Sequence, residues 1–476
     1  MEGIGVPRVE IKEFQRRADE VASFLKSNLS PDTRVKIVTH TDADGISAAS
    51  ILARYLHDRD VPFHVVFSRP LRHDEVVELS KEDYDFFVFI DQGSAQVSEI
   101  HKHVLGEGRN VLILDHHPGE FPEHSKLGHL NPHACNLNGA SDISAAGVVY
   151  SVVERLDKKF RPMVWLAVVG ALGDRQEFSS GFVGINEGFV KRAMDLNVLR
   201  VGKGLKLIGR TQSPVVECLR LSIRPYLPGI TGNVEACREL VKSLGIPPEG
   251  KIAELGVERE AGLRDALFAR SNATLISEEF RHILWGPLYV LREEIEVFPA
   301  ELHEYAAMLE ACGELGSPNV GFAATMGDEA SATDALALLK RYQGRMVEVL
   351  KWLEGNLDAF ETTPKFRCIY VGREIDPKMV GEAISLAVES GLVKADRPVV
   401  GIAESNGELK VSARATRVHV ARGVNLGESL RRAAASVGGV GGGHDVAAAA
   451  RIPLTKRNEF IAALDETLPR VKEGRK

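Results

Sequence analysis

The 476-residue sequence predicts an α/β protein with a parallel sheet in its N-terminal domain, a helical or mixed middle insertion and a second α/β domain at the C-terminus. Three observations support this prediction. The composition, with 44% hydrophobic and 26% charged residues, is that of a folded protein. Short apolar runs alternate with helical segments, which is typical of a parallel sheet covered on both faces. Acidic residues or histidines directly follow three of those runs.

The N-terminal domain, predicted to span 1–200, begins with an amphipathic helix at 8–29 that ends where Ser30 and Pro31 interrupt it. Four strands and three further helices follow. The strands are predicted at 35–39, 62–68, 86–90 and 111–114, and the helices at 46–57, 144–157 and 162–172.

The middle insertion is predicted to span 205–330, with helical patterns but no cluster of His, Asp or Cys residues. A connector helix follows within 331–360, with Thr333 as its N-cap and Gly355 just beyond its end. The last domain is predicted to span 361–476. Its strands are predicted near 366–372, 397–403 and 409–416, and the helices of the insertion near 234–244 and 259–267.

The cysteines, the apolar stretches and the distribution of charge exclude several classes of protein. The five cysteines include no C-x-x-C pair, which excludes a structural zinc site of that kind and a disulfide framework. No signal-peptide core or membrane-length apolar stretch is visible, so we expect a soluble cytoplasmic protein. The net charge of -7 excludes a uniformly basic surface, but residues 410–476 hold 13 Lys and Arg against 6 Asp and Glu, a surplus of +7. A basic face on the C-terminal domain is therefore expected.

Three predicted strands end in residues that bind metal ions. His40, Asp42 and Asp44 follow the first, Asp91 follows the third, and Asp115-His116-His117 follows the fourth; Asp174 follows an apolar helix. The carboxyl ends of parallel strands share one edge of a sheet, where ligands bind. Converging carboxylates stay ionised only beside strong positive charge, and oxygen-rich sets with one or two imidazoles suit Mg²⁺ or Mn²⁺.

Two ions are expected at this edge. Asp42 and Asp44 lie two residues apart and can serve neighbouring ions. Asp91 can bridge ions roughly 3.5–4 Å apart, as sites for two-metal phosphoryl transfer require. The prediction is therefore a centre that hydrolyses phosphate esters.

The motifs H-T-D-A-D-G (40–45), D-Q-G (91–93), D-H-H-P (115–118) and G-D-R-Q (173–176) resemble, in order and spacing, those of the DHH phosphoesterase superfamily. Asn131-Pro132 and the stretch 144–147 resemble its nuclease branch. In a second block, Ser412-Ala413-Arg414 and the glycine-rich run 438–443 followed by His444 resemble the DHHA1 domain that binds substrate beside such cores. The two blocks, about 34–180 and 366–460, cover roughly half of the chain.

The resemblance implies a role for each matching residue. Asp115 would orient the histidines, and His117 would face the scissile phosphate and complete the catalytic set. Bacterial members commonly have an acid where His40 stands. The implied metal ligands are His40, Asp42, Asp44, Asp91, His116 and Asp174, and the implied substrate-binding residues are Ser412, Arg414, Gly441, Gly442, Gly443 and His444.

The chemical properties of the implied substrate-binding residues suit a phosphate. Glycines let backbone N–H groups approach a phosphate closely, and Arg414 and His444 can donate to its oxygens. A flexible loop is the alternative interpretation of the glycine run.

The layout resembles archaeal RecJ-like exonucleases, including the GINS-associated type. It implies a nuclease that uses two Mn²⁺ or Mg²⁺ ions to hydrolyse single-stranded DNA, and RNA as a further substrate, to mononucleotides in replication and repair. Digestion is expected 5′→3′, and the middle insertion is expected to contact GINS in the replicative helicase complex. The alternatives are a 3′→5′ exonuclease, an oligoribonuclease of the nanoRNase kind, a helicase-complex scaffold and a single-strand binding module.

Overall fold

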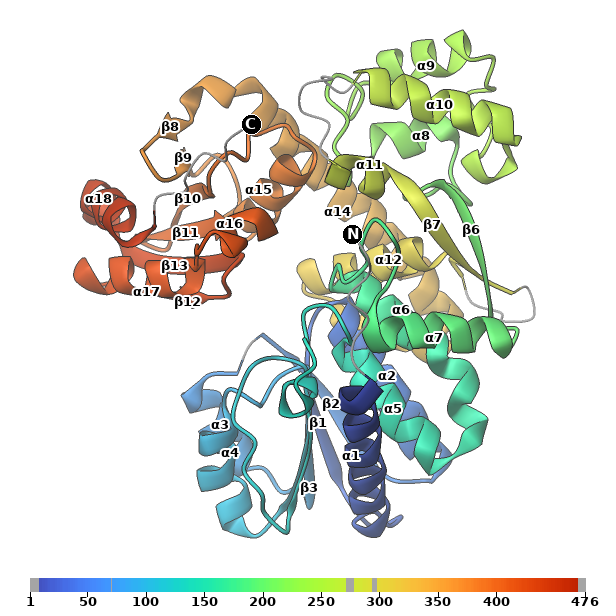
Figure 1. Ribbon diagram of the computed structural model, residues 1–476, viewed down its shortest axis with the longest axis vertical. Coiled ribbons are helices and arrows are strands. Elements are labelled where there is room, and N and C mark those ends of the chain that lie inside the picture. The colour runs from blue at the N-terminus through green and yellow to red at the C-terminus, as the bar shows by residue number, and fades with distance from the viewer. Residues whose placement is uncertain (1–7, 70, 271–277, 293–297, 470–476) are drawn as a thin grey trace. The chain divides into compact units, whose positions relative to one another are not determined.

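The computed structural model describes residues 8–69, 71–270, 278–292 and 298–469 (Figure 1). The chain divides into two compact units. Unit 1 comprises residues 1–211 and 286–342, and unit 2 comprises residues 212–285 and 343–476. Both units consist of helices and a sheet, so the predicted α/β class is confirmed, with a parallel N-terminal sheet, a helical middle part and a mixed C-terminal sheet. The predicted domain boundaries stay predictions.

Unit 1 is built on a five-stranded parallel sheet. Its strand order is β2-β1-β3-β4-β5, and the register pairs Thr39 with Ile90 and Ile90 with Leu114, so β1, β3 and β4 end at the same level. The change of direction in strand order lies between β1 and β3, where ligands bind in folds of this kind. The strands are β1 (Val35–His40), β2 (Phe63–Ser68), β3 (Phe86–Ile90), β4 (Asn110–Leu114) and β5 (Leu127–Leu130).

Helices cover both faces of this sheet, as Figure 1 shows. Phe87 and Phe89 of β3 pack in a buried cluster with residues of α3 and α4. Phe86 points the other way and contacts Phe24 of α1, with ring centroids 6.0 Å apart. Every residue of β3 is therefore buried, which explains its continuously apolar sequence. The helices on the two faces are α1 (Arg8–Ser27), α2 (Ala43–Asp58), α5 (Ala145–Leu156) and α6 (Val164–Gly173) on one, and α3 (His73–Ser80) and α4 (Val97–His103) on the other.

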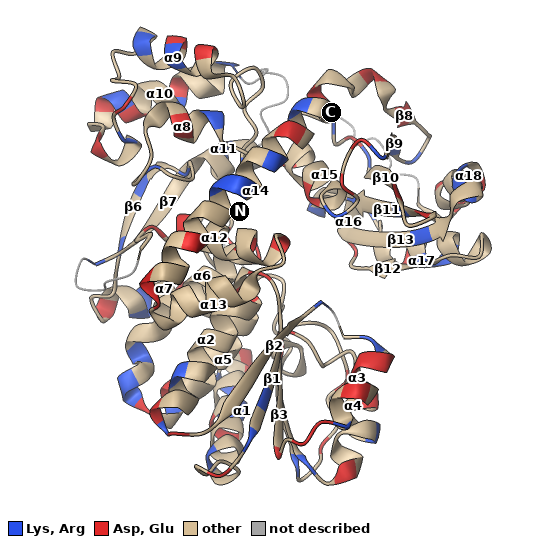
Figure 2. Ribbon diagram, turned by 180° about the vertical axis from the view of Figure 1, so that it is seen from behind, with Lys and Arg blue, Asp and Glu red and all other residues tan. Residues whose placement is uncertain are grey.

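Part of the predicted middle insertion belongs to unit 1. Helix α6, which has no charged residue and is entirely tan in Figure 2, packs against α12, where Trp165 and Tyr305 place their ring centroids 5.2 Å apart. Helix α13 packs on α2 and α12. The remaining elements of unit 1 are α7 (Gly184–Asp195), β6 (Leu199–Leu205) paired with β7 (Trp285–Leu291), α12 (Leu302–Glu314) and α13 (Pro318–Met326).

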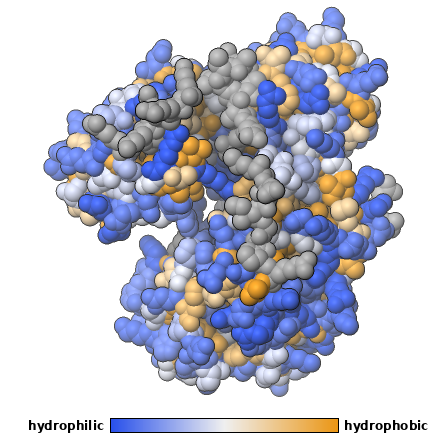
Figure 3. Space-filling view, viewed as in Figure 1, coloured by the Kyte–Doolittle hydropathy of each residue, from blue (hydrophilic) through white to orange (hydrophobic). Residues whose placement is uncertain are grey.

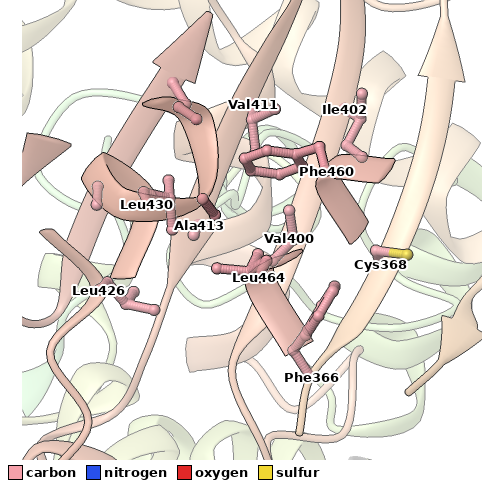
Figure 4. Close-up of a cluster of buried hydrophobic side chains, with 14 of the residues drawn as sticks. Phe366, Cys368, Val400, Ile402, Val411, Ala413, Leu426, Leu430, Phe460 and Leu464 are labelled. Carbon is pink, nitrogen blue, oxygen red and sulfur yellow. The ribbon is translucent and has the colours of Figure 1, made fainter. Parts of the chain in front are cut away.

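Unit 2 contains a mixed six-stranded sheet of order β12-β13-β11-β10-β9-β8. Its core is drawn in Figure 4, where residues of the strands meet Phe460 and Leu464 of α18. The strands are β8 (Glu361–Thr362), β9 (Arg367–Gly372), β10 (Val399–Ser405), β11 (Glu408–Arg414), β12 (Val440–Gly443) and β13 (Ala447–Pro453). The helices are α8 (Val215–Arg220), α9 (Val234–Ser243), α10 (Val257–Arg270), α11 (Glu278–Leu284), α15 (Val380–Glu389), α16 (Arg417–Ala421), α17 (Leu426–Ser436) and α18 (Arg457–Thr467).

The predicted ends of the connector helix were wrong, and the alternative interpretation of the glycine run as a flexible loop does not hold for its strand residues. The long helix α14 (Glu329–Gly355) begins four residues before Thr333, whose hydroxyl donates to the carbonyl of Glu329 at 3.2 Å. The Asp328 carboxylate, which accepts from the backbone N–H of Ser331 at 2.8 Å, caps this end instead. Gly355 is the last helical residue. Residues 440–443 of the glycine run are not a loop, because they form the edge strand β12.

The sequence led to expectations about the hydrophobicity of the helices, the exposed residues and the cysteines. Among the described residues, no helix combines the length and the hydrophobicity needed to cross a membrane. Figure 3 shows hydrophilic residues over much of the face in view, with smaller hydrophobic areas between them. All five cysteines lie in the described part of the chain, where they are buried and none forms a disulfide bond.

Candidate metal centre

The edge formed by the ends of β1, β3 and β4 gathers the predicted acidic residues and histidines. Asp42 caps α2, where its Oδ1 accepts from the N–H of Gly45 at 2.9 Å. Asp91 follows β3 with φ 59°, a left-handed conformation that Asp and Asn tolerate better than other non-glycine residues. His116 follows β4. Loop turns at the ends of these strands therefore direct all three side chains toward the same edge.

His116 lies at the centre of three carboxylates. Its Nε2 is 3.1 Å from Asp91 Oδ1, 3.3 Å from Asp174 Oδ2 and 4.0 Å from Asp44 Oδ2. Asp44, His116 and Asp174 place their ligand atoms within 4.8 Å of one another, as do Asp91, His116 and His117. The first part of the predicted ligand set is thus brought together.

His40 and Asp42 form a second donor group with the other oxygen of Asp91. His40 Nδ1 is 2.5 Å from Asp42 Oδ2 and 3.9 Å from Asp91 Oδ2. These three residues also place their ligand atoms within 4.8 Å of one another. Asp91 therefore faces this group with Oδ2 and the His116 group with Oδ1.

The hydrogen bonds of His116 test whether these residues suit a cation. Its Nδ1 lies 2.7 Å from the carbonyl oxygen of Gly139, so this nitrogen is a donor, and Nε2 faces the carboxylates either with a proton or with a lone pair turned to a cation. A histidine ligand typically holds its second nitrogen on a backbone carbonyl in this way. Acceptor atoms facing acceptor atoms require a shared cation or proton. The set of carboxylates and imidazoles fits a divalent ion of the Mg²⁺ or Mn²⁺ type.

Burial makes the carboxylates costly to ionise without that cation. Burial, together with the charges of Asp42 and Asp44, raises the pKa of Asp91 well above its usual value. Burial and the charge of Asp44 do the same to the pKa of Asp174. Burial opposes the charged form of His116, but the carboxylates of Asp174 and Asp44 outweigh it and raise the pKa of His116 to about 9. The cluster therefore holds extra protons when no metal is bound.

We expect metal affinity to rise with pH, because binding must displace those protons. His40 also contributes: burial opposes its charged form, but Asp42 and Asp91 raise its pKa to about 10. Both imidazolium ions hold their protons below these pKa values and lose them as pH rises through them. Mn²⁺ titrations followed by calorimetry should show tighter binding and fewer protons released at about pH 9 than at about pH 6. Affinity that falls over this range would contradict the assignment.

Asp115 holds the two histidines in place. Its Oδ1 accepts from the backbone N–H groups of His116 and His117, at 2.8 and 3.1 Å, and from Nδ1 of His117 at 2.9 Å. Its Oδ2 accepts from the N–H of Ser94 at 3.0 Å. Burial opposes ionisation, but the hydrogen bond from His117, the charges of His117 and His116 and the N–H of Ser94 keep the pKa of Asp115 below its usual value. This geometry agrees with the orienting role expected for Asp115.

Hydrogen bonds fix the side chains of Asp44 and Asp174. Both Asp44 oxygens accept N–H groups at the start of α5, from Ala145 at 2.7 Å and Ala146 at 2.8 Å. Gln176 Nε2 donates to Asp174 Oδ2 at 3.2 Å and to the Gly139 carbonyl at 2.9 Å. The Gly139 carbonyl thus links the position of Asp174 to that of His116.

Helix α12 supplies two residues that sequence reasoning missed. Glu310 Oε2 accepts from the N–H of Ala43 at 3.2 Å, at the start of α2 between Asp42 and Asp44. Gly313 lies so close that a Cβ atom there would be 1.9 Å from the carbonyl oxygen of Thr41. These residues lie about 270 positions from the motif they support, and no local pattern marks them.

The predicted substrate-binding residues lie in unit 2. Ser412 is buried on β11, and the Arg414 guanidinium donates to the Ser385 hydroxyl of α15 at 2.6 Å. Gly443 pairs with Ala448, the residue next to Ala447, which pairs with Arg414. The end of β11 and the end of β12 therefore flank the start of β13, with exposed His444 in the turn between β12 and β13.

Two family models match the chain. The model of the DHH family, N-terminal domain, matches residues 34–171, and the model of the DHHA1 domain matches residues 365–469. The sequence is 28% identical over 440 residues to the uncharacterized protein MJ0831 of Methanocaldococcus jannaschii, covering 91% of this chain and 93% of that protein. It is 24% identical over 237 residues to the single-stranded-DNA-specific exonuclease RecJ of Thermus thermophilus, covering 47% of this chain but only 34% of RecJ.

Solved structures with the same fold agree. RecJ of Thermus thermophilus in complex with Mn²⁺ matches with a TM-score of 0.59 and 19% identity, over 95% of this chain and 54% of that chain. CDC45 of Entamoeba histolytica matches with a TM-score of 0.65 and 14% identity, over 96% of this chain and 98% of that chain. The two domains follow one another in the expected order. The chain therefore belongs to the DHH/DHHA1 superfamily of phosphoesterases and is RecJ-like.

Proposed function

We propose that the protein is a metal-dependent exonuclease that hydrolyses single-stranded DNA, and RNA as a further substrate, to mononucleotides, from the 5′ end. The observation that carries this proposal is Asp91, which offers one oxygen to each of two buried groups of metal-binding atoms. The similarity to the single-stranded-DNA-specific exonuclease RecJ supports the substrate class.

The proposed metal ligands are His40, Asp42, Asp44, Asp91, His116 and Asp174. Divalent ions bound there would supply the positive charge that activates water and neutralises the attacked phosphate. The protein's own contribution is to fix the donor atoms beforehand, through α5 at Asp44 and through Gly139 at His116. Because Asp115 accepts from Nδ1 of His117, the Nε2 atom of His117 is the one that can face the scissile phosphate, and it can donate to it when the ring is an imidazolium.

The DHHA1 domain is proposed to bind the strand. Its β12 is an edge strand, so one row of backbone groups along the glycines is not used by the sheet. A phosphate could approach these groups closely because no side chain stands in the way. The proposed contacts are Ser412, Arg414, Gly441, Gly442, Gly443 and His444, although buried Ser412 is more suited to positioning than to direct contact. The +7 surplus of residues 410–476 favours a polyanion.

Gly442→Ala separates this role from a purely structural one. A Cβ atom at Gly442 meets no heavy atom within 4 Å, so the substitution should leave the melting temperature unchanged. If the backbone of Gly442 contacts a phosphate, the added methyl group should raise KM for a single strand by about tenfold, the worth of one good hydrogen bond. Gly344→Ala, in α14 and equally uncrowded, is the control with unchanged KM. An unchanged KM in Gly442→Ala would exclude this contact.

End-labelled strands test the proposed function. Wild-type protein and Asp174→Ala are incubated with Mn²⁺ and single-stranded DNA or RNA of one sequence, labelled at the 5′ or the 3′ end. Immediate release of labelled mononucleotide from the 5′ end, lost in Asp174→Ala, is expected. Release from the 3′ end first would reverse the polarity, and cleavage confined to RNA of a few nucleotides would indicate an oligoribonuclease. No cleavage of any strand or short oligomer would refute the proposal.

The likeness to CDC45 favours a second candidate, a scaffold in the replicative helicase complex. In this candidate the middle segment would contact GINS. A scaffold has no use for six converging metal-binding side chains, so we expect any such role to accompany catalysis. Binding of GINS by the Asp174→Ala variant, without cleavage by the wild type, would favour the scaffold alone.

A further inference from the structure

A second group of potential metal ligands lies on α3 and α4, apart from the acidic edge. His73 Nδ1 is 2.7 Å from Glu99 Oε2, and His103 Nε2 is 3.4 Å from the same oxygen. The rings of His73 and His103 lie edge to face, with centroids 5.6 Å apart. All three residues place a ligand atom within 4.8 Å of the others.

Rigid elements hold these three residues. Glu99 and His103 stand one turn apart on the same side of α4, and His73 is the first residue of α3. Both helices are anchored in the core of unit 1, α3 through Val76 and α4 through Ile100. The side chains therefore converge without any rearrangement of the backbone, as a metal site requires.

His103 gives an independent indication of a missing ligand. Among the described residues, its buried Nε2 atom has no hydrogen-bond partner, although it faces Glu99 Oε2. A buried polar nitrogen without a partner is costly, and here it is directed at the shared carboxylate oxygen. A cation placed between the two imidazoles and the carboxylate would satisfy this atom.

We propose that His73, Glu99 and His103 bind a transition-metal ion of the Zn²⁺ class. Two imidazoles and one carboxylate are the ligands of many zinc sites, with a water in the fourth position, whereas Mg²⁺ and Mn²⁺ prefer sites richer in oxygen. The acidic residues of the first turn of α3, Asp74 and Glu75 (red in Figure 2), stand next to His73, where both also pair with Arg72. The ion would link α3 to α4, which is the helix that follows the Asp91 motif.

Zinc titrations of the whole protein test the site without relying on nuclease activity. Metal-stripped protein is held in excess Mg²⁺ and titrated with Zn²⁺ against a chromogenic chelator. We compare the wild type with the double variant His73→Ala/His103→Ala. The control is His101→Ala/His124→Ala, which removes another neighbouring pair, with ring centroids 5.3 Å apart, that belongs to no group of three potential metal ligands among the described residues.

The wild type and the control are expected to bind one more tightly held Zn²⁺ than the double variant, whose affinity at this site should fall more than about a hundredfold. Zn²⁺ should also slow amide hydrogen exchange in α3 and α4 of the wild type and of the control, but not of the double variant. Glu99→Gln, which keeps both imidazoles, should lose the same ion. Loss of zinc in this milder variant would show that misfolding of the double variant is not the cause. Equal zinc stoichiometry in all proteins, or binding only at millimolar Zn²⁺, would overturn the proposal.

Discussion

Replacing Asp91 with Asn is expected to lower Mn²⁺-dependent cleavage by more than about a hundredfold, since changes one shell farther from a metal already cost about 10- to 100-fold. Asn keeps the shape of the side chain and tolerates the φ of 59° at this position, so the backbone should not change. What is lost is the carboxylate charge that serves both groups of metal-binding atoms. The measurement is the single-turnover rate on an end-labelled single strand.

The same substitution should stabilise the metal-free protein. Burial and the charges of Asp42 and Asp44 raise the pKa of Asp91, so ionising it in the folded state costs stability as pH rises through that pKa. We expect Asp91→Asn to raise the metal-free melting temperature by about 2 °C or more at about pH 8, since one kcal/mol corresponds to about 2–4 °C in domains of this size. The difference should shrink as the pH falls toward about 4, the ordinary pKa of an aspartic acid, because the carboxyl then keeps its proton in the folded and in the unfolded state. Lower stability of the metal-free variant at every pH would contradict the electrostatic account.

Gly313→Ala has the second large expected effect. A Cβ atom at this position of α12 would lie 1.9 Å from the carbonyl oxygen of Thr41, so the helix or the loop that carries Asp42 must move. Overpacking of this kind costs about 1–3 kcal/mol of the free energy of unfolding. A displacement of about 1 Å at a reacting centre can cost a hundredfold in rate. We expect kcat to fall by about that factor, with weaker binding of Mn²⁺.

Gly188→Ala is the matched control for this substitution. It lies within α7 of the same unit, and its added Cβ atom meets nothing within 4 Å. Alanine favours the helix over glycine by about 0.5–1 kcal/mol, so this variant should be slightly more stable and fully active. Full activity in Gly313→Ala would show that α12 does not position the first motif.

The sheet of unit 1 could be predicted because its strands are short, continuously apolar runs in the sequence. Phe86–Ile90 is apolar throughout, since helices bury both of its faces, and the predicted range is the observed one. The site could be predicted for a related reason. Parallel strands end at one edge, so Asp91 and His116, which follow two neighbouring strands, had to approach one another.

The remaining features depend on contacts between distant segments. Glu310 hydrogen-bonds Ala43, but the sequence around Glu310 shows only an ordinary helical pattern. The glycines at 441–443 have little intrinsic preference for a strand; they form one because β13 offers a partner of small residues, Ala448–Ala450, that lets the two backbones pair closely. Thr333 is a good N-cap by composition, yet Asp328 precedes it and begins α14 earlier.

Direct measurement of Mn²⁺ binding tests the central claim, that the acidic residues and histidines at the edge of the parallel sheet form a divalent-metal site. Electron paramagnetic resonance of free Mn²⁺ in titrations of the wild type and Asp91→Asn counts the bound ions. The account predicts two bound ions per wild-type chain and at least one fewer in the variant, whose far-ultraviolet circular dichroism should match the wild type. Equal Mn²⁺ binding by the two proteins would contradict it.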